Sequence, residues 1–337
     1  MNRQNLTIAD VAKELGVSKT TVSRAISGKG RISEGTRQRV LAYIKEHDYI
    51  PNVIAKGLAQ SRTFNLCVVM PRDYIFVDLP FFQGVIAGIQ EVAAVSGYDV
   101  LLCICSEDDV SHLERIIRNR KVDGVLLLRT LVKDLQIELL QEYMMPFVAV
   151  GSTCYPNVVQ VDHDHEKACM EMTSQLLKLG MKRIALLGGS RDYVVMQNRY
   201  RGYCRAYTQL QKELDESLVF KDLKEVELVH GALEKALEKS ADCILCMDDG
   251  ICIQVLRKLR SDHVHVPKDI KVASFYNSSI LENNQPAISS LSFDVRKLGM
   301  EACKNLLGQI EGEEVSQKTL LSYEVRLNES TGEGLIL

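Results

Sequence analysis

The chain has 337 residues, of which 46% are apolar and 25% are charged, with only 7 Pro and 21 Gly. These proportions are typical of folded globular proteins, and they exclude a disordered, collagen-like or coiled-coil chain. The net charge of -3 hides an asymmetry, because residues 1–62 carry a net charge of +6 and the remaining residues carry -9. A basic segment followed by a larger acidic one predicts that the N-terminal end meets a polyanion.

The compartment is indicated by what the chain lacks. No apolar run of the kind found in signal peptides occurs near the start, and no stretch of about 18 apolar residues follows. The 10 cysteines lie after residue 62, mostly in apolar runs, which is typical of core residues in a reducing compartment. Cys243 and Cys246 have a spacing that suits zinc or a disulfide, but no second pair accompanies them. We expect a cytoplasmic protein without membrane contact.

Residues 6–26 predict two short helices joined by a turn. Thr7 and Asp10 resemble a capping box, and Gly16 ends the first helix because glycine adopts positive φ freely. Ser18 caps the second helix. The apolar positions predicted to face inward are Ile8, Val11, Ala12, Leu15, Val22, Ala25 and Ile26. This pattern indicates a helix-turn-helix, with a third helix from Ser33 to about His47 that buries Val40, Leu41 and Ile44.

The outward face of the second helix favours DNA over a plain helical hairpin. Its exposed positions hold hydroxyl groups and two cations but no acid: Ser18, Lys19, Thr20, Thr21, Ser23 and Arg24. Hydroxyl groups and the N–H groups of a helix start suit phosphate oxygens, and Lys or Arg can reach guanine in the major groove. The segment 51–62 follows, with Asn52 as a candidate helix cap. A helix this short, containing Gly57, is unstable alone, so the segment is either a linker or a hinge that orders on DNA.

Three blocks, residues 7–12, 17–24 and 51–58, closely resemble the lactose/galactose repressor (LacI/GalR) family of bacterial transcription regulators. The resemblance implies a head at residues 1–50, a hinge helix at 51–62, and a homodimer bound to operator DNA. It places Lys19, Thr20 and Arg24 at base-contacting positions, and we expect Ser18, Thr21 and Ser23 to contact phosphates. It places Ala55 and Leu58 in the minor groove, where Leu58 would act as the apolar wedge that kinks the operator.

After Phe64 short apolar strands alternate with helical stretches. The predicted strands are 64–70, 100–104, 124–128, 147–151, 184–188, 243–247 and 271–275, and the predicted helices include 84–96, 167–179 and 250–259. Continuous apolar strands separated by helices indicate parallel sheets covered on both faces. About 275 residues are too many for one small sheet, so two α/β lobes are expected.

The family resemblance extends over this core, residues 63–337, and implies two doubly wound parallel-sheet lobes of the periplasmic-binding-protein-like kind. Lobe 1 would comprise about 63–160 and 292–320, and lobe 2 about 161–291 and 321–337, with crossings near 161, 291 and 321. The core would bind an effector and hold the dimer together. The residues after Leu327 are too few for heptads, so the tetramerising coil of some relatives is not expected.

The resemblance also places an effector in the cleft between the lobes, beyond the carboxyl ends of the strands. It implies contacts from Phe81, Phe82, Asp162, Arg199 and Asp249. In this chain Tyr276 stands where the family usually has an acid, and Phe293 stands where Gln is common. Aromatic faces in place of polar groups favour a ring-containing or acidic, sugar-related effector over a neutral hexose. The alternatives are that Phe81 and Phe82 are only core residues and that Arg199 is a surface cation.

The run from Asp162 to Glu166 alternates acids with His163 and His165, a pattern that can ligate zinc or manganese. Because it falls where a strand gives way to a helix, a solvated helix start is the favoured interpretation. No metal, no cofactor and no catalytic set is predicted. The sequence thus predicts a DNA-binding transcription regulator, most simply a repressor, rather than an enzyme.

Three alternatives remain. One is a solute-binding protein with the same core, and another is an enzyme with a fused DNA-binding head. The third is a regulator controlled by a protein partner, with a degenerate small-molecule pocket.

Overall fold

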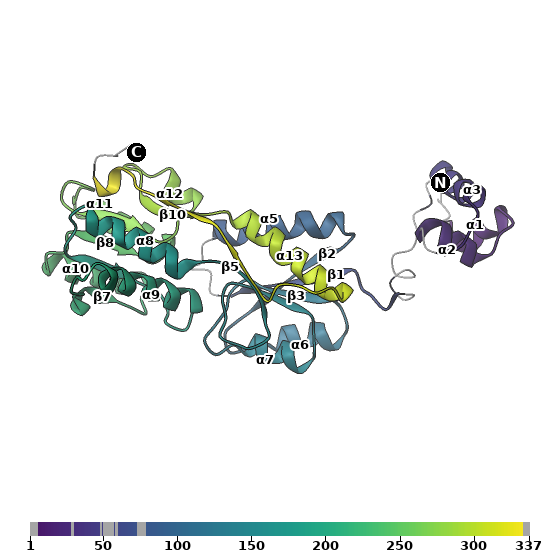
Figure 1. Cartoon of the computed structure of the whole chain (residues 1–337), viewed down its shortest axis with the longest axis horizontal. Helices are drawn as coiled ribbons and strands as arrows, with labels where there is room; N and C mark the ends of the chain where they lie inside the picture. The colour runs from purple at the N-terminus through teal and green to yellow at the C-terminus, as the bar shows by residue number, and fades with distance from the viewer. Residues whose placement is uncertain are drawn as a thin grey trace. The chain divides into compact units, whose positions relative to one another are not determined.

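The computed structural model describes residues 6–27, 30–47, 49, 57, 60–72 and 79–332. The chain divides into two compact units, Met1–Thr63 and Phe64–Leu337 (Figure 1). Within the described ranges, no helix is long and apolar enough to cross a membrane.

The first unit is built from three helices, α1 (Ile8–Glu14), α2 (Lys19–Ser27) and α3 (Glu34–Glu46). The predicted capping box is confirmed, because the Thr7 N–H donates to Asp10 Oδ2 over 2.9 Å and the Asp10 N–H donates to Thr7 Oγ1 over 3.3 Å. Gly16 has the expected positive φ of 63°. Ser18 and Ser33 accept from the N–H groups of Thr21 and Thr36, so both predicted caps are confirmed.

The small core of this unit contains Val11, Ala12, Val22, Ala25, Val40 and Tyr49. The expectation that Leu41 is buried was wrong, since 44% of its surface is exposed. Val40 and Ile44 lie on the inner side of α3, and Leu41, next to Val40 in sequence, is turned toward solvent by the 100° step between neighbouring helical residues.

The second unit contains two six-stranded sheets. In spatial order, the first sheet consists of β11 (Lys318–Leu321), β5 (Val159–His163), β4 (Phe147–Val150), β3 (Gly124–Leu127), β1 (Asn65–Pro71) and β2 (Asp99–Cys105). The second consists of β12 (Tyr323–Arg326), β10 (Ser289–Phe293), β9 (Lys271–Ser274), β8 (Cys243–Cys246), β6 (Ile184–Leu187) and β7 (Val219–Phe220). Every neighbouring pair is parallel except β10 with β12. All seven predicted strands are confirmed, and so is the fold class.

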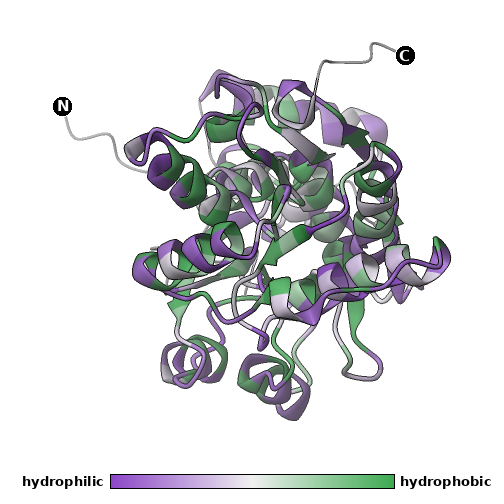
Figure 2. Ribbon diagram, turned by 90° about the vertical axis from the view of Figure 1, so that its left-hand side faces the viewer, coloured by the Kyte–Doolittle hydropathy of each residue, from purple (hydrophilic) through white to green (hydrophobic). Residues whose placement is uncertain are grey.

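Helices cover both faces of each sheet. Those of the first lobe are α5 (Leu79–Val95), α6 (Ser111–Arg118), α7 (Leu135–Glu142) and α13 (Val295–Glu311). Those of the second lobe are α8 (His165–Lys178), α9 (Val194–Gln209), α10 (Val226–Glu238), α11 (Asp249–Ser261) and the short α12 (Ser279–Glu282), with 3-10 turns η1 (Glu216–Leu218) and η2 (Glu329–Thr331). Figure 2 shows apolar residues concentrated on the strands and on the helix sides that face them. This is the burial pattern of doubly wound sheets.

The chain crosses between the lobes at three places, after β5, after β10 and between β11 and β12 (Figure 1). The sequence put the lobe changes near 161 and 291, but residues 161–163 still pair in the first sheet and residues 292–293 still pair in the second. Each strand keeps its backbone hydrogen bonds to its end before the chain leaves the sheet. Strand-end side chains are thereby brought to the boundary between the lobes.

Candidate nucleic-acid interface and candidate ligand cleft

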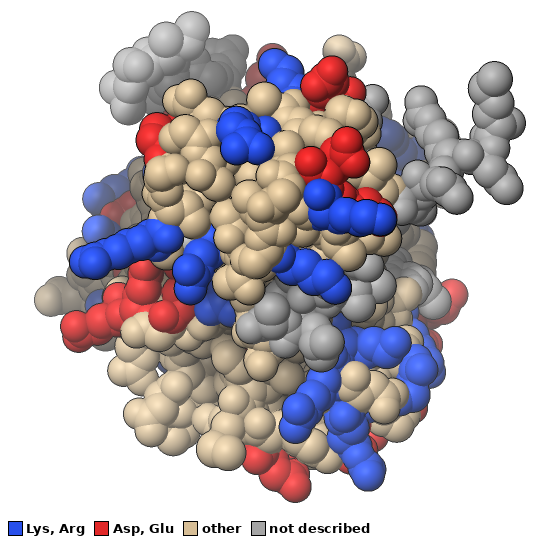
Figure 3. All heavy atoms as spheres, turned by 90° about the vertical axis from the view of Figure 1, so that its right-hand side faces the viewer, with Lys and Arg blue, Asp and Glu red and all other residues tan. Residues whose placement is uncertain are grey.

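The outward face of α2 is the candidate nucleic-acid interface. Lys19, Thr20, Ser23 and Arg24 are exposed, whereas Val22 and Ala25 on the opposite face are buried. Ser18 and Thr21 share a hydroxyl–hydroxyl hydrogen bond of 2.9 Å at the helix start. The face seen in Figure 3 carries many Lys and Arg side chains with Asp and Glu side chains among them.

The side chain of Arg24 lies close to Gly30, which follows its helix. A Cβ added at Gly30, where φ is 89°, would lie 3.0 Å from Arg24 Cδ and 3.1 Å from its Nε. The Arg24 side chain therefore runs against this glycine, and the turn needs glycine for its backbone conformation as well. The predicted minor-groove residues Ala55 and Leu58 lie outside the described residues, as does the candidate cap Asn52.

A cleft of about 1020 Å³ lies between the two lobes of the second unit. All seven residues predicted for effector contact line it, together with others from both lobes: Phe81, Phe82, Asp162, Arg199, Asp249, Tyr276 and Phe293. They come from β5, α5, α9, α11, β10 and the loop after β9. Parallel strands direct their carboxyl ends to the same edge of a sheet, which explains how segments far apart in sequence meet here.

Aromatic rings form one wall of this cleft. Tyr276 stacks on Phe293 with ring centroids 6.2 Å apart and an interplanar angle of 12°, and Phe81 meets Tyr276 edge-on at 5.9 Å. Phe82 is buried in the first-lobe core and also borders the cleft, whereas Phe81 is only half-buried. The pair is therefore neither purely core nor purely cleft: Phe82 belongs to the core, and both rings border the cleft.

Arg199 is a buried cation at the cleft, not a surface one. Only 6% of its surface is exposed, and one of its terminal nitrogens donates to the Met247 carbonyl. Its Cζ lies 6.0 Å from the centre of the Tyr276 ring, and its Nε is buried with no hydrogen-bond partner. A buried donor without an acceptor is costly, so this nitrogen suits an acceptor supplied by a ligand.

Two acids stand beside this cation at the start of α11. Asp248 caps the helix by accepting from the Ile251 N–H over 2.8 Å, and Asp249, 1% exposed, accepts from the Gly250 N–H. Burial, with the neighbouring Asp249 charge, raises the pKa of Asp248 to about 6. The site therefore combines a fixed cation with a carboxyl group whose charge changes near neutral pH.

The interpretation of the run 162–166 as a solvated helix start was wrong for three of its residues. Asp162, His163 and His165 are 3%, 2% and 8% exposed. Asp164 and Glu166 do lie at the helix start as predicted: Asp164 accepts from the Lys167 N–H over 3.0 Å, and Glu166 lies in the first turn of α8. β5 runs into the boundary between the lobes, and β10 covers it there through Phe293, whose ring centroid is 4.7 Å from that of His163 and 4.9 Å from that of His165.

Asp162 is held by several partners. Its Oδ2 accepts from the Ser152 N–H and from the Ser152 hydroxyl, both over 2.7 Å, and its Oδ1 lies 3.3 Å from His165 Nε2. Burial alone would raise the pKa of Asp162, but His165 and Ser152 outweigh it and lower this pKa to about 2. Burial, assisted by the neighbouring His165, lowers the pKa of His163 to about 4.

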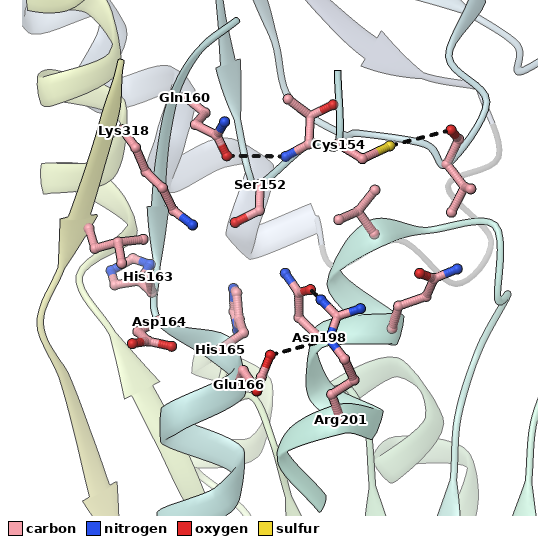
Figure 4. Close-up of a pocket in the computed structure, with 15 residues that line it drawn as sticks. Ser152, Cys154, Gln160, His163, Asp164, His165, Glu166, Asn198, Arg201 and Lys318 are labelled. Atoms are coloured by element: carbon pink, nitrogen blue, oxygen red, sulfur yellow. Dashed lines mark hydrogen bonds and ion pairs between the residues drawn. The ribbon is translucent and has the colours of Figure 1, made fainter. Parts of the chain in front are cut away.

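A smaller pocket of about 250 Å³ is also lined by these histidines (Figure 4). Ser152, Gln160 and Lys318 line it from the first lobe, and Asn198 and Arg201 line it from the second. His163 and His165 border both this pocket and the large cleft. The sequence pattern identified these histidines only as possible metal ligands. Their spacing along the chain could not show that both side chains would be buried.

The cysteine pair Cys243 and Cys246 lies wholly inside β8, and burial raises the pKa of both thiols. Thiols of this kind are unreactive, which matches the expectation of core residues. Of the 10 cysteines, eight are buried, Cys204 is half-buried and Cys154 is exposed.

Comparison with known families gives two matches, one in each unit. Residues 7–52 match the family described as bacterial regulatory proteins, lacI family. Residues 173–331 match the periplasmic binding protein-like domain. The first match covers α1, α2 and α3, and the second covers much of the lobe that carries Arg199, Asp249 and Tyr276.

Similar proteins extend these matches to nearly the whole chain. The HTH-type transcriptional regulator RegA of Clostridium saccharobutylicum is 28% identical over 96% of this chain and 98% of its own length. The HTH-type transcriptional regulator MalR of Streptococcus pneumoniae is 27% identical over 95% and 98%.

Among solved structures, a transcriptional regulator CelR–cellobiose complex is 28% identical, with a TM-score of 0.73 over 96% of this chain and 99% of that one. The lac repressor dimer bound to operator, 22% identical, shares the fold with a TM-score of 0.79 over 98% of this chain and 100% of that one.

Proposed function

The chain belongs to the lacI family of bacterial regulatory proteins and is a DNA-binding transcriptional regulator, and from this premise we propose that it represses transcription as an effector-controlled homodimer. Lys19, Thr20 and Arg24 contact bases of the operator in this proposal, and Ser18, Thr21 and Ser23 contact phosphates. Five of these six side chains are exposed, Thr21 is half-buried, and the helix that carries them is capped, which supports these roles. Two identical heads suit an operator with two related half-sites.

The second part of the proposal is that a ligand bound in the cleft of about 1020 Å³ sets operator affinity. The observation that carries it is the unpartnered, buried Nε of Arg199 beside the stacked rings of Tyr276 and Phe293. A cation needing an acceptor and an aromatic wall suit a sugar-related ligand that carries an acidic group or a ring. The similar CelR structure holds cellobiose, which supports the sugar-related class.

Control by the ligand follows from its position between two lobes. A ligand that binds one lobe arrangement more tightly than another shifts the population toward it by that difference in affinity. Because the hinge, residues 51–62, joins this core to the head, the shift would alter how Ala55 and Leu58 enter the minor groove. Leu58 is the proposed wedge, since a leucine side chain can unstack a base step.

Two measurements test the proposal. Selection of bound sequences from random DNA should yield a preferred site with two related half-sites. A thermal-shift panel of neutral sugars, sugar phosphates, sugar acids and nucleosides should show stabilisation by an acidic or ring-containing member, lost in Arg199→Ala. Arg201→Ala is the matched control, since Arg201 is on the same helix but borders only the smaller pocket.

A neutral hexose that stabilises wild type and Arg199→Ala equally would contradict the proposed pocket. No stabilisation by any panel member, with capture of one specific protein that changes operator affinity, would favour a protein partner.

A further inference from the structure

Three potential metal ligands meet where the chain first crosses between the lobes. Asp162 and His163 end β5, and His165 begins α8. One donor atom from each residue lies within 4.8 Å of the others. A strand that turns at once into a helix brings side chains one and three positions apart into one cluster, although an unbroken strand would point Asp162 and His163 to opposite faces.

The cluster is enclosed and its carboxylate is oriented. All three residues are at least nine-tenths buried, and Ser152 holds Asp162 Oδ2 through its N–H and its hydroxyl. Such supporting hydrogen bonds commonly orient a metal-binding carboxylate. The other oxygen, Asp162 Oδ1, accepts from the His163 N–H over 2.8 Å and lies 3.3 Å from His165 Nε2. Two ligands about 2.0–2.2 Å from one tetrahedral ion are separated by about 3.4 Å, so this pair already has ligand spacing.

A second observation is that the ring of His163 carries an unsatisfied nitrogen. His163 Nε2 is buried and has no hydrogen-bond partner. Buried polar atoms are normally paired, and an exception calls for an explanation such as a bound ion. The donor atom of His163 lies within 4.8 Å of the other two donor atoms, against about 3.4 Å for two ligands of one tetrahedral ion.

We propose that Asp162, His163 and His165 bind a divalent transition-metal ion of the zinc class. Imidazole with one carboxylate suits zinc, cobalt or nickel, whereas magnesium and calcium prefer oxygen ligands throughout. Three protein ligands leave a coordination position for water or for a ligand atom. His163 and His165 border both the smaller pocket (Figure 4) and the large cleft, so an ion can enter from either side.

The proposal is tested with the full-length protein, freed of metal by a chelator and titrated with Co²⁺ and Zn²⁺ in the absence of DNA. We expect one equivalent of metal per chain, with the visible ligand-field absorption of a low-coordinate cobalt site. The double variant His163→Ala, His165→Ala should bind at least about 100-fold more weakly, because loss of a mere supporting residue already costs 10–100-fold.

His265→Ala is the matched control, since His265 forms an exposed pair with Asp269 at 3.1 Å, and it should leave binding unchanged. Cys154→Ser controls for the exposed thiol and should also have no effect. Unchanged binding in the double variant, loss of binding in either control, or no binding by wild type would each overturn the proposal.

X-ray absorption of the zinc-loaded wild type supplies a test that does not depend on folding of a variant. Two imidazole ligands and oxygen neighbours are expected, and sulfur neighbours would overturn the assignment. The metal site would share Asp162 with the proposed effector cleft, but these experiments contain neither effector nor DNA. Their failure would therefore leave the proposed DNA binding and effector binding untouched.

Discussion

Arg24 is exposed on the outer face of α2, and its side chain lies against Gly30, where φ is 89°. It is the residue of this helix best suited to two parallel hydrogen bonds with a guanine edge.

Arg24→Ala should therefore weaken binding to the selected operator by about 1–3 kcal/mol and relax the preference at one base position in each half-site. Fluorescence anisotropy with operator variants measures both effects. Lys45→Ala, an exposed cation on α3, is the control and should leave the base preference unchanged. Equal losses on operator and random DNA would show that Arg24 contacts only phosphate.

Asp248 carries a pH dependence of stability that one substitution can isolate. Its pKa is raised from 3.8 to about 6 in the folded chain, so the folded state holds this proton more tightly than the unfolded state. Stability contributed by the protonated form is thus present below pH 4 and is lost as pH rises toward 6. The pKa of His163 is lowered to about 4, so the stability that depends on this residue rises with pH between 4 and 6.5. The pH dependence of wild-type stability is therefore the sum of two opposing contributions.

Asp248→Asn keeps an acceptor that can cap α11 but removes the buried charge. Relative to wild type, this variant should gain stability as pH rises from 4 to 6, by at most about 3 kcal/mol because one pKa unit is worth about 1.4 kcal/mol. Melting temperatures of the variant and of wild type from pH 4 to 8 measure the gap in stability between them. A gap that stays constant across this range would contradict the raised pKa.

At the scale of elements, the crossing of α5 and α13 joins two segments that are more than 200 residues apart in sequence. Glycines permit this contact, since a Cβ at Gly299 would lie 2.1 Å from the Val85 carbonyl oxygen, and one at Gly88 would lie 2.0 Å from the Arg296 carbonyl oxygen. Backbone atoms cannot move aside as side chains can, so the helices must separate to accept a methyl group.

Gly299→Ala should lower the stability of the core by about 1–3 kcal/mol, which corresponds to a fall in melting temperature of roughly 2–10 °C. Gly231→Ala in α10 is the matched control, since nothing lies within 4 Å of its added Cβ. It should be neutral or slightly stabilising, because alanine is the better helix former. Equal melting temperatures for the two variants would contradict a close helix crossing.

At the scale of the whole molecule, the uneven charge predicts that DNA binding depends strongly on salt. Residues 1–62 carry a net charge of +6 and the rest carries -9, so we expect attraction to phosphate mainly from residues 1–62. Logarithmic plots of operator affinity against salt should fall with a slope of about -0.9 for each phosphate neutralised, or near -5 for about six contacts. Titration from about 50 to 200 mM salt measures this slope, and a salt-insensitive complex would contradict an electrostatic contribution.

The sequence by itself determined what depends on local order along the chain. The capping pair Thr7 and Asp10, the positive φ of Gly16, the face of α2 and the seven apolar strands all follow from spacing and backbone preference. The candidate cleft residues were identified from motif resemblance. They could be expected to meet because the carboxyl ends of parallel strands lie at one edge of a sheet, whatever the loops between them. Leu41 was misplaced because a short amphipathic helix leaves the edge of its buried face undefined.

Only the tertiary structure decided which of these side chains are enclosed and with what. The run 162–166 reads as a polar helix start, yet β10 and Phe293 cover Asp162, His163 and His165 from a segment more than 120 residues away. Likewise, the approach of Gly299 to Val85 and the orphaned Nε of Arg199 depend on neighbours brought by the lobe crossings. Burial, missing hydrogen-bond partners and shifted pKa values arise from contacts between residues distant in sequence. A local sequence pattern contains no information about such contacts.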